Sequence, residues 1–243
     1  MQRLYPLYDF GSFPIFNTIV ALGFLLASVL LNYNLNKIND TKTRKDNIII
    51  YLGLSFIFGI AISNIANWFM FPDLQNQNII YKIKHAGFTF YFGLLTFLIS
   101  IYVFLKFFNY DASLYLNEII PSITLFHFIG RIACLLGGCC YGKILNLTLY
   151  SFTIERYPTR ELSIFFLLFL TIIFQIFLKK NRLFIYLTVY PIYRFSIEFA
   201  RGDNRGHLFT KILSPSQEIS IIILLFVLLF FLYGHFKKYF IIK

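Results

Sequence analysis

The chain has 243 residues, of which 58% are hydrophobic and 14% are charged, against about 25% charged residues in an ordinary soluble domain. Its mean hydropathy is +0.69, which excludes a soluble globular domain of this length and predicts a polytopic membrane protein. The net charge of +11 does not indicate nucleic-acid binding, because the basic residues are scattered through short loops between apolar runs.

Seven apolar runs are each close to the length of about 20 residues that crosses a hydrocarbon core. In chain order they lie near residues 14–31, 48–71, 87–108, 119–136, 162–178, 183–199 and 219–233. We therefore predict an all-α polytopic membrane protein with about seven transmembrane helices around a lipid-accessible central cavity. No internal repeat or linker is evident, so residues 1–243 are expected to form a single membrane-embedded domain, with a small extramembrane segment near residues 143–160.

The basic residues predict the orientation of these spans. Three regions that seven spans place on one side of the membrane are rich in lysine and arginine: the first loop, the fifth loop and the C-terminus. Their basic residues are Lys37, Lys42, Arg44, Lys45, Lys179, Lys180, Arg182, Lys237, Lys238 and Lys243. The positive-inside rule makes this side the cytoplasm, so the N-terminus is expected outside and the C-terminus inside.

The end of the fourth run, residues 130–142, combines one arginine with four glycines and all three cysteines of the chain. An arginine at membrane depth is costly unless it is paired or reaches water, so Arg131 is predicted to be functional. Its planar guanidinium suits a phosphate or a carboxylate. The alternative is a structural arginine whose side chain extends to the interface. The glycines, among them Gly130, Gly138 and Gly142, allow close approach of a ligand to the backbone.

The cysteines of this segment are Cys134, Cys139 and Cys140. A metal site would favour a CxxC spacing or nearby histidines, and neither is present. Cysteine also packs well as a small residue between apolar helices. Packing is therefore the favoured interpretation, an activated thiol or a redox role stays open, and neither a metal nor a cofactor is predicted.

The sixth run carries a second polar group. On a helix, Tyr190, Arg194, Glu198 and Arg201 follow one another at i, i+4, i+8 and i+11 and form one polar stripe. Such a stripe is too costly to face lipid. We expect Glu198 to orient Arg194 toward an anionic headgroup. The alternative is a closed Arg194–Glu198–Arg201 network that only fixes helix packing.

Two smaller features complete the candidates. Ser214 or Ser216 is expected to cap the last helix, with Pro215 in its first turn. His85, in a loop, would suit a general base, although a loop histidine is more often simply solvated.

With these residues in view, the chain resembles the prolipoprotein diacylglyceryl transferase family. Residues 130–142 resemble the glycine-arginine signature of that family, in a variant form that ends Cys-Cys-Tyr-Gly. The polar residues of the sixth run match its Tyr…Arg…Glu…Arg pattern. Residues 11–13 and 21–24 resemble its N-terminal region, and residues 214–220 resemble the start of its last span. The resemblance covers nearly the whole chain.

The resemblance implies a reaction in the bacterial inner membrane. The diacylglyceryl group of phosphatidylglycerol would pass to the thiol of a lipobox cysteine in a prolipoprotein, with release of glycerol phosphate. The implied partners are phosphatidylglycerol, the prolipoprotein lipobox segment and membrane lipids, and no cofactor is implied. The implied catalytic residues are Arg131, Arg194, Tyr91 and Tyr190, and the implied substrate-binding residues are Gly130, Gly138, Gly142, Glu198 and Arg201.

The chain also departs from the family pattern. Tyr91-Phe92-Gly93 stands where the third span of the family usually carries His-Gly-Gly, and Tyr91 is a poor base at pH 7 because the pKa of tyrosine is near 10. Cys134 replaces an asparagine, Cys139 an acidic residue and Phe16 a tyrosine. These departures leave open a non-catalytic or repurposed paralogue that binds phospholipid headgroups. A solute or ion transporter is the third possibility, but the internal symmetry typical of transporters is not seen.

Overall fold

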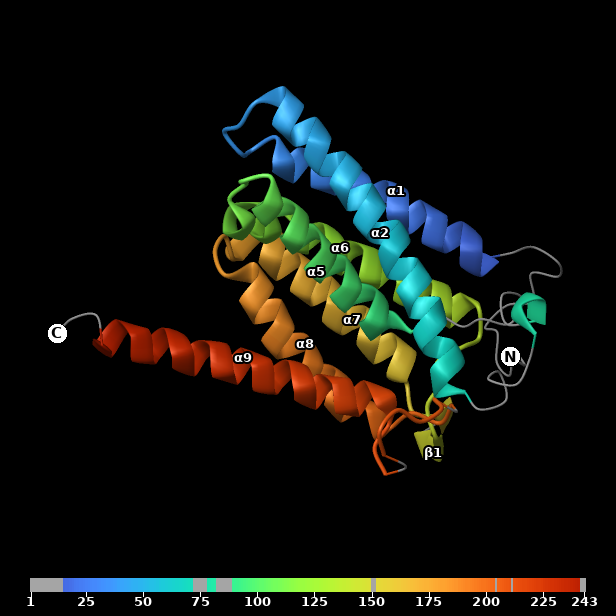
Figure 1. Cartoon of the computed structure of the whole chain (residues 1–243). Coiled ribbons are helices and arrows are strands. Elements are labelled where there is room, and N and C mark those ends of the chain that lie inside the picture. Colours follow the sequence, from blue (N-terminus) through green and yellow to red (C-terminus); the bar gives the residue numbers. More distant parts are fainter. Residues whose placement is uncertain are drawn as a thin grey trace. The chain divides into compact units, whose positions relative to one another are not determined.

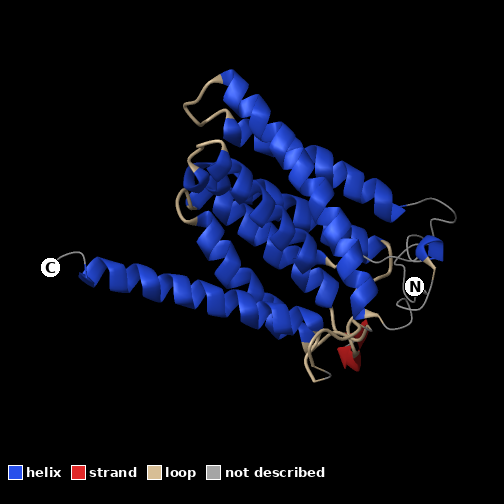
Figure 2. Cartoon of the chain, in the orientation of Figure 1, coloured by secondary structure: helices blue, strands red, loops and turns tan. Residues whose placement is uncertain are grey.

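The structure is a computed structural model that describes residues 15–71, 78–81, 89–149, 152–203, 205–210 and 212–240. The N-terminal resemblance at residues 11–13 and the candidate base His85 lie outside the described residues. Helices dominate the described part, which also contains a short two-stranded sheet (Figure 2). The predicted all-α membrane fold is confirmed.

Each predicted apolar run coincides with a helix (Figure 1). The helices are α1 (Ile15–Leu35), α2 (Lys42–Met70), α5 (Phe90–Phe107), α6 (Ala112–Leu136), α7 (Thr159–Ile172) with the π-helix η1 (Ile173–Phe177), α8 (Arg182–Glu198) and α9 (Pro215–Phe240). Within the described ranges, six are long and apolar enough to cross a membrane, with α7 and η1 counted as one. Helix α8 has 17 residues, or about 26 Å at 1.5 Å per residue, which is slightly shorter than a hydrocarbon core of about 30 Å.

Two compact units make up the chain. The first contains residues 1–39, 113–183 and 199–204, and the second contains residues 40–112, 184–198 and 205–243. Helices α1, α6 and α7 belong to the first unit, and helices α2, α5 and α9, with nearly all of α8, belong to the second.

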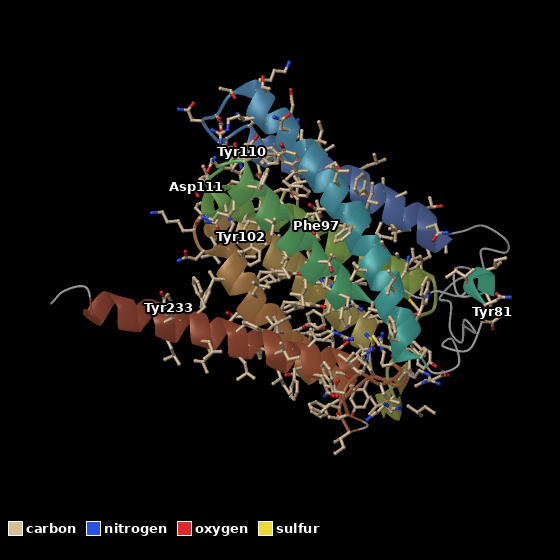
Figure 3. All side chains as sticks on the ribbon, in the orientation of Figure 1. Tyr81, Phe97, Tyr102, Tyr110, Asp111 and Tyr233 are labelled. Carbon is tan, nitrogen blue, oxygen red and sulfur yellow. The ribbon has the colours of Figure 1, made fainter. Side chains whose placement is uncertain are left out.

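Large apolar side chains cover the outer faces of the helices. Figure 3 shows Tyr102 on α5 and Tyr233 on α9, whose side chains are 47% and 67% exposed. Lipid rather than water meets such faces, so apolar burial alone does not hold the helices together, and close backbone approach and polar bonds contribute more.

The pair α2 and α5 in the second unit illustrates this packing (Figure 1). A Cβ on Gly59 would lie 2.9 Å from the carbonyl oxygen of Gly93, so only glycine allows the two backbones to approach this closely. The Ser63 hydroxyl donates to the carbonyl oxygen of Thr89 at 2.9 Å and accepts from its amide at 2.8 Å. These contacts fix the start of α5, where Tyr91 lies.

A buried polar network holds the first unit. Arg182 is 1% exposed, and its Nη1 lies 2.9 Å from Glu118 Oε1 and donates to the carbonyl oxygen of Asn117 at 3.0 Å. Asn34 on α1 accepts from the Gln175 amide at 3.1 Å. A charge that leaves water needs such partners, so this network ties α1, α6 and η1 to the chain at the start of α8.

The segment predicted to lie outside the membrane forms a hairpin. Strand β1 (Ile144–Leu149) pairs antiparallel with β2 (Phe152–Arg156), with an irregularity between Ile144 and Leu147. An open strand pair leaves backbone groups that lipid cannot satisfy, so the hairpin suits an aqueous or interfacial position.

Candidate active site

The candidate residues fall into two groups. Arg131, the three cysteines and Arg201 belong to the first unit, in the segment that we call the cysteine turn (residues 131–142) and the loop bonded to it. Tyr91, Arg194 and Glu198 belong to the second unit and, with two serines of α9, form what we call the arginine–serine cluster.

Within the cysteine turn, helix α6 ends in a motif that requires a glycine at position 138. Gly138 has a φ of +70°, its amide donates to the carbonyl oxygen of Leu135 at 3.4 Å, and the Cys139 amide donates to that of Cys134 at 3.1 Å. This pair of bonds around a left-handed glycine is the Schellman motif, which brings the residue after the glycine back onto the last turn of the helix. Cys139 therefore lies beside Cys134.

Arg131 and Cys140 complete the turn. Arg131 is 9% exposed, and its Nη1 donates to the Cys140 sulfur at 3.9 Å. Cys140 itself has a φ of +63°, and the Thr159 hydroxyl donates to its carbonyl oxygen at 3.1 Å. The three cysteine sulfurs lie within 4.8 Å of one another. In the described part of the chain they are the group with the composition and spacing to hold a metal ion.

Cys139 and Cys140, which lie beyond the end of α6, have thiols whose pKa values shift in opposite directions. Hydrogen bonds from Cys134 and Cys139, and the charges of Arg201 and Arg131, hold the pKa of the Cys140 thiol well below its ordinary value, although burial opposes this shift. A hydrogen bond with Cys134 lowers the pKa of Cys139, but its bond to Cys140, burial and the Cys140 charge outweigh that effect and raise the pKa to about 12. Of the two thiols, Cys140 is therefore the more acidic.

Arg201 lies in the loop after α8. It forms an isolated antiparallel bridge with Gly142, and its Nε and Nη2 donate to the two carboxylate oxygens of Asp203 at 3.0 and 2.9 Å. Because α8 ends at Glu198, the prediction that Arg201 continues the helical stripe is wrong. The chain turns at residues 199–200 and brings Arg201 to the cysteine turn instead.

The glycines differ in their surroundings. A Cβ on Gly142 would collide with the backbone of Tyr157, and Gly138 needs its left-handed conformation. A Cβ on Gly130 would meet nothing within 4 Å. Gly142 and Gly138 are therefore required by the fold, whereas Gly130 leaves space beside α6.

In the second unit, the rest of the stripe forms as expected. Arg194 Nη2 lies 2.7 Å from Glu198 Oε2, and the two side chains are 6% and 4% exposed. The Arg205 Nε lies 3.9 Å from the other oxygen of Glu198. The carboxylate therefore holds the Arg194 guanidinium in one orientation and offsets part of its charge.

Two serines of α9, which the sequence did not single out as site residues, join this cluster. Ser214 caps the helix: its hydroxyl accepts from the Gln217 amide at 3.3 Å, while the Gln217 side chain accepts from the Ser214 amide at 3.0 Å. This capping box confirms the expected cap at Ser214. Ser216 and Ser220 follow at i and i+4 on one face. The Ser216 hydroxyl accepts from Arg194 Nη2 at 2.9 Å.

Tyr91 meets the second of these serines. Its hydroxyl lies 2.8 Å from the Ser220 hydroxyl, and its side chain is 3% exposed. Tyr190, 2% exposed, packs edge-on against the Tyr91 ring at 5.6 Å. In the sequence, these serines could have been found from the i, i+4 spacing of Ser216 and Ser220 at the start of an apolar span. The cluster presents one fixed guanidinium with hydroxyl groups, a combination suited to a phosphate ester.

Comparison with known proteins identifies the family of the chain. A family model described as prolipoprotein diacylglyceryl transferase matches residues 8–233. The phosphatidylglycerol–prolipoprotein diacylglyceryl transferase of Clostridium tetani is 30% identical over 240 residues, which cover 92% of this chain and 94% of that protein. The corresponding transferase 2 of Clostridium perfringens is 27% identical over 221 residues, 85% of each chain. That of Dehalococcoides mccartyi is 27% identical over 172 residues, 64% of this chain and 65% of that protein. The chain therefore belongs to the prolipoprotein diacylglyceryl transferase family.

Proposed function

We propose that this protein transfers the diacylglyceryl group of phosphatidylglycerol to the thiol of a lipobox cysteine in a prolipoprotein and releases glycerol phosphate. The observation that carries the proposal is the buried Arg194 guanidinium, oriented by Glu198 and Ser216 in a chain that the transferase family model matches from residue 8 to residue 233. A guanidinium fixed at low dielectric stabilises the charge of a departing phosphate more than one in water does.

The roles follow from the residue chemistry. Arg131 and Arg194 neutralise phosphate, and Tyr91 and Tyr190 complete the catalytic set, with the Tyr91 hydroxyl as a hydrogen-bond donor. The proposed substrate-binding residues are Gly130, Gly138, Gly142, Glu198 and Arg201. The nucleophile is the thiol of the acceptor, which reacts as a thiolate.

The family and the apolar helices make the protein a multi-pass protein of a bacterial membrane. We propose further that this is the inner membrane, with the N-terminus outside and the C-terminus in the cytoplasm. Residues 1–243 would act as one membrane-embedded domain, with residues 143–160 outside the bilayer. The basic loops support this orientation.

The non-catalytic alternative is not favoured. It rests on Tyr91 at the place of the family histidine, whereas relatives that match 85% or more of this chain carry the name of the transferase.

The test is a transfer assay with purified protein, phosphatidylglycerol and a lipobox peptide, in which released glycerol phosphate is measured. Replacement of Arg131 or Arg194 by alanine should lower the rate at least about 100-fold, as loss of a preorganised donor does. Arg44→Ala is the matched control, because Arg44 is 41% exposed in its pair with Asp40, and it should keep the parent rate. No release by the parent protein at high concentration would overturn the proposed function, and full activity of Arg194→Ala would overturn the proposed phosphate site.

A further inference from the structure

The chain has three cysteines, and the turn after α6 brings all three sulfur atoms within 4.8 Å of one another. We propose that Cys134, Cys139 and Cys140 bind one thiophilic metal ion, with Zn²⁺ as the expected ion, and leave one coordination position open.

The backbone sets up the geometry. The Schellman motif fixes Cys139 beside Cys134, and the left-handed backbone of Cys140 keeps the next sulfur in the same group. Zinc–sulfur bonds of about 2.3 Å place tetrahedrally arranged sulfurs about 3.8 Å apart. The observed separations exceed this value by at most about 1 Å.

The charges around the turn also suit a metal–thiolate centre. Three thiolates and one Zn²⁺ carry a net charge of −1. Arg131 donates to the Cys140 sulfur at 3.9 Å, and Arg201 pairs through its backbone with Gly142, two residues after Cys140. Two arginines beside a sulfur stabilise a thiolate, whereas a disulfide carries no charge for them to stabilise. The arrangement therefore favours metal binding over oxidation to a disulfide.

The donor set selects the ion. Sulfur ligands favour Zn²⁺ or Cu⁺ over Mg²⁺ and Ca²⁺, which take oxygen ligands. Among the described residues, no histidine or carboxylate completes the group. Three protein ligands and a vacant position are typical of zinc sites that bind a reactant, and four protein ligands are typical of structural zinc sites.

The open position suits a thiol from outside the chain. On binding, a new metal–sulfur bond forms, the thiol proton passes to solvent and a bound water leaves. The identity of this thiol as the lipobox cysteine rests on the transferase function proposed above. Such binding would generate the acceptor thiolate that Tyr91, a poor base at neutral pH, does not supply.

The first experiment measures metal content in the purified full-length protein. Mass spectrometry should find about one zinc ion per chain, and each single replacement of a cysteine by serine should lower occupancy at least about tenfold. His207→Ala removes an exposed potential ligand outside the turn and should keep the parent occupancy. Unfolding temperature and elution profile show whether each variant is folded. Chelated parent protein should regain one ion on addition of Zn²⁺. Its failure to do so, or the presence of a disulfide in place of metal, would overturn the site.

The second experiment replaces zinc with Co²⁺ and uses its absorption as a reporter. The parent protein should show sulfur-to-cobalt charge-transfer bands, which a lipobox peptide with its cysteine should strengthen and shift. A peptide with serine at that position should leave them unchanged. Equal spectra with both peptides would overturn the open thiol position. Neither measurement needs phosphatidylglycerol, so a metal-loaded protein without transfer activity would refute the proposed function and leave the metal site standing.

Discussion

Tyr91 has a defined partner for its hydroxyl, which allows its role to be tested by removal of one atom. In Tyr91→Phe, the Ser220 hydroxyl loses the contact at 2.8 Å but keeps its bond to the carbonyl oxygen of Ser216 at 2.7 Å. Stability should therefore fall by only about 1 kcal/mol. If the hydroxyl assists the reaction, kcat in the transfer assay should fall at least about tenfold, with little change in KM.

The control for this variant is Tyr186→Phe. Tyr186 is also fully buried in the second unit and stacks on Tyr190 at 5.5 Å. It should keep the parent kcat. An equal loss of kcat in both variants would assign Tyr91 a packing role.

The contribution of Asp203 to folding stability should fall as the pH rises, the reverse of the usual effect of a paired carboxylate. Burial raises the pKa of its carboxyl, although the Arg201 charge opposes this shift. A raised pKa means that the folded protein binds the proton more tightly than the unfolded chain. Asp203 therefore stabilises the fold less as the pH rises through the interval between the two pKa values.

Asp203→Asn removes this titration. As the pH rises above the ordinary pKa of aspartate, about 3.9, the unfolding temperature of the parent should fall relative to that of Asp203→Asn, as measured by thermal unfolding in detergent. A relative rise over this range would show that the ion pair with Arg201 dominates.

At the scale of the element, two glycines of α6 and the cysteine turn should respond in opposite ways to alanine. Gly138→Ala forces a residue with a side chain into a φ of +70° and should cost about 1 kcal/mol of stability. Gly130→Ala adds a methyl group in open space on a helix and should leave stability equal or raise it by up to about 1 kcal/mol. Chemical or thermal unfolding measures both.

Activity separates the two glycines further. If Gly130 borders the bound lipid, Gly130→Ala should raise KM for phosphatidylglycerol several-fold while the fold is kept. An unchanged KM would show that the space beside Gly130 is not used by substrate.

The helices were predictable from the sequence, because a chain in lipid must satisfy its backbone within each span. Their ends were less predictable. Helix α2 begins at Lys42, before its apolar run, because Thr41 accepts from the Arg44 amide at 3.3 Å and caps it. Helix α8 ends at Glu198, so the spacing that joined Arg201 to the stripe did not hold.

The cysteine group could not be predicted from linear spacing alone. Cys134 and Cys139 are five residues apart, which matches no common metal motif. Gly138 was the overlooked signal: a glycine just past a helix end predicts a Schellman motif, which brings these two positions into contact. Ser216 was assigned to capping for a similar reason, since its contact with Arg194 depends on the packing of two helices.

At the scale of the whole molecule, the proposed orientation predicts how reporter fusions behave. Alkaline phosphatase, active only outside the cytoplasm, should be active when fused after Asp203 and inactive when fused after Lys180. A fluorescent protein that matures in the cytoplasm should give the reverse result. The reason is the basic charge near Lys180, which the positive-inside rule keeps in the cytoplasm. Activity of the phosphatase after Lys180 would contradict the orientation.

The bridge between Gly142 and Arg201 bears on recombination between relatives. The Lys143 amide donates to the carbonyl oxygen of Ala200 at 2.8 Å, and the Gly202 amide donates to that of Tyr141 at 3.0 Å. These bonds bind two loops that lie about sixty residues apart in the chain, without use of any side chain. An insertion or deletion in either loop would shift the register of the other. In chimeras built from two family members, residues 137–143 and 199–203 therefore have to come from the same parent, so a single crossover should fall before residue 137 or after residue 203.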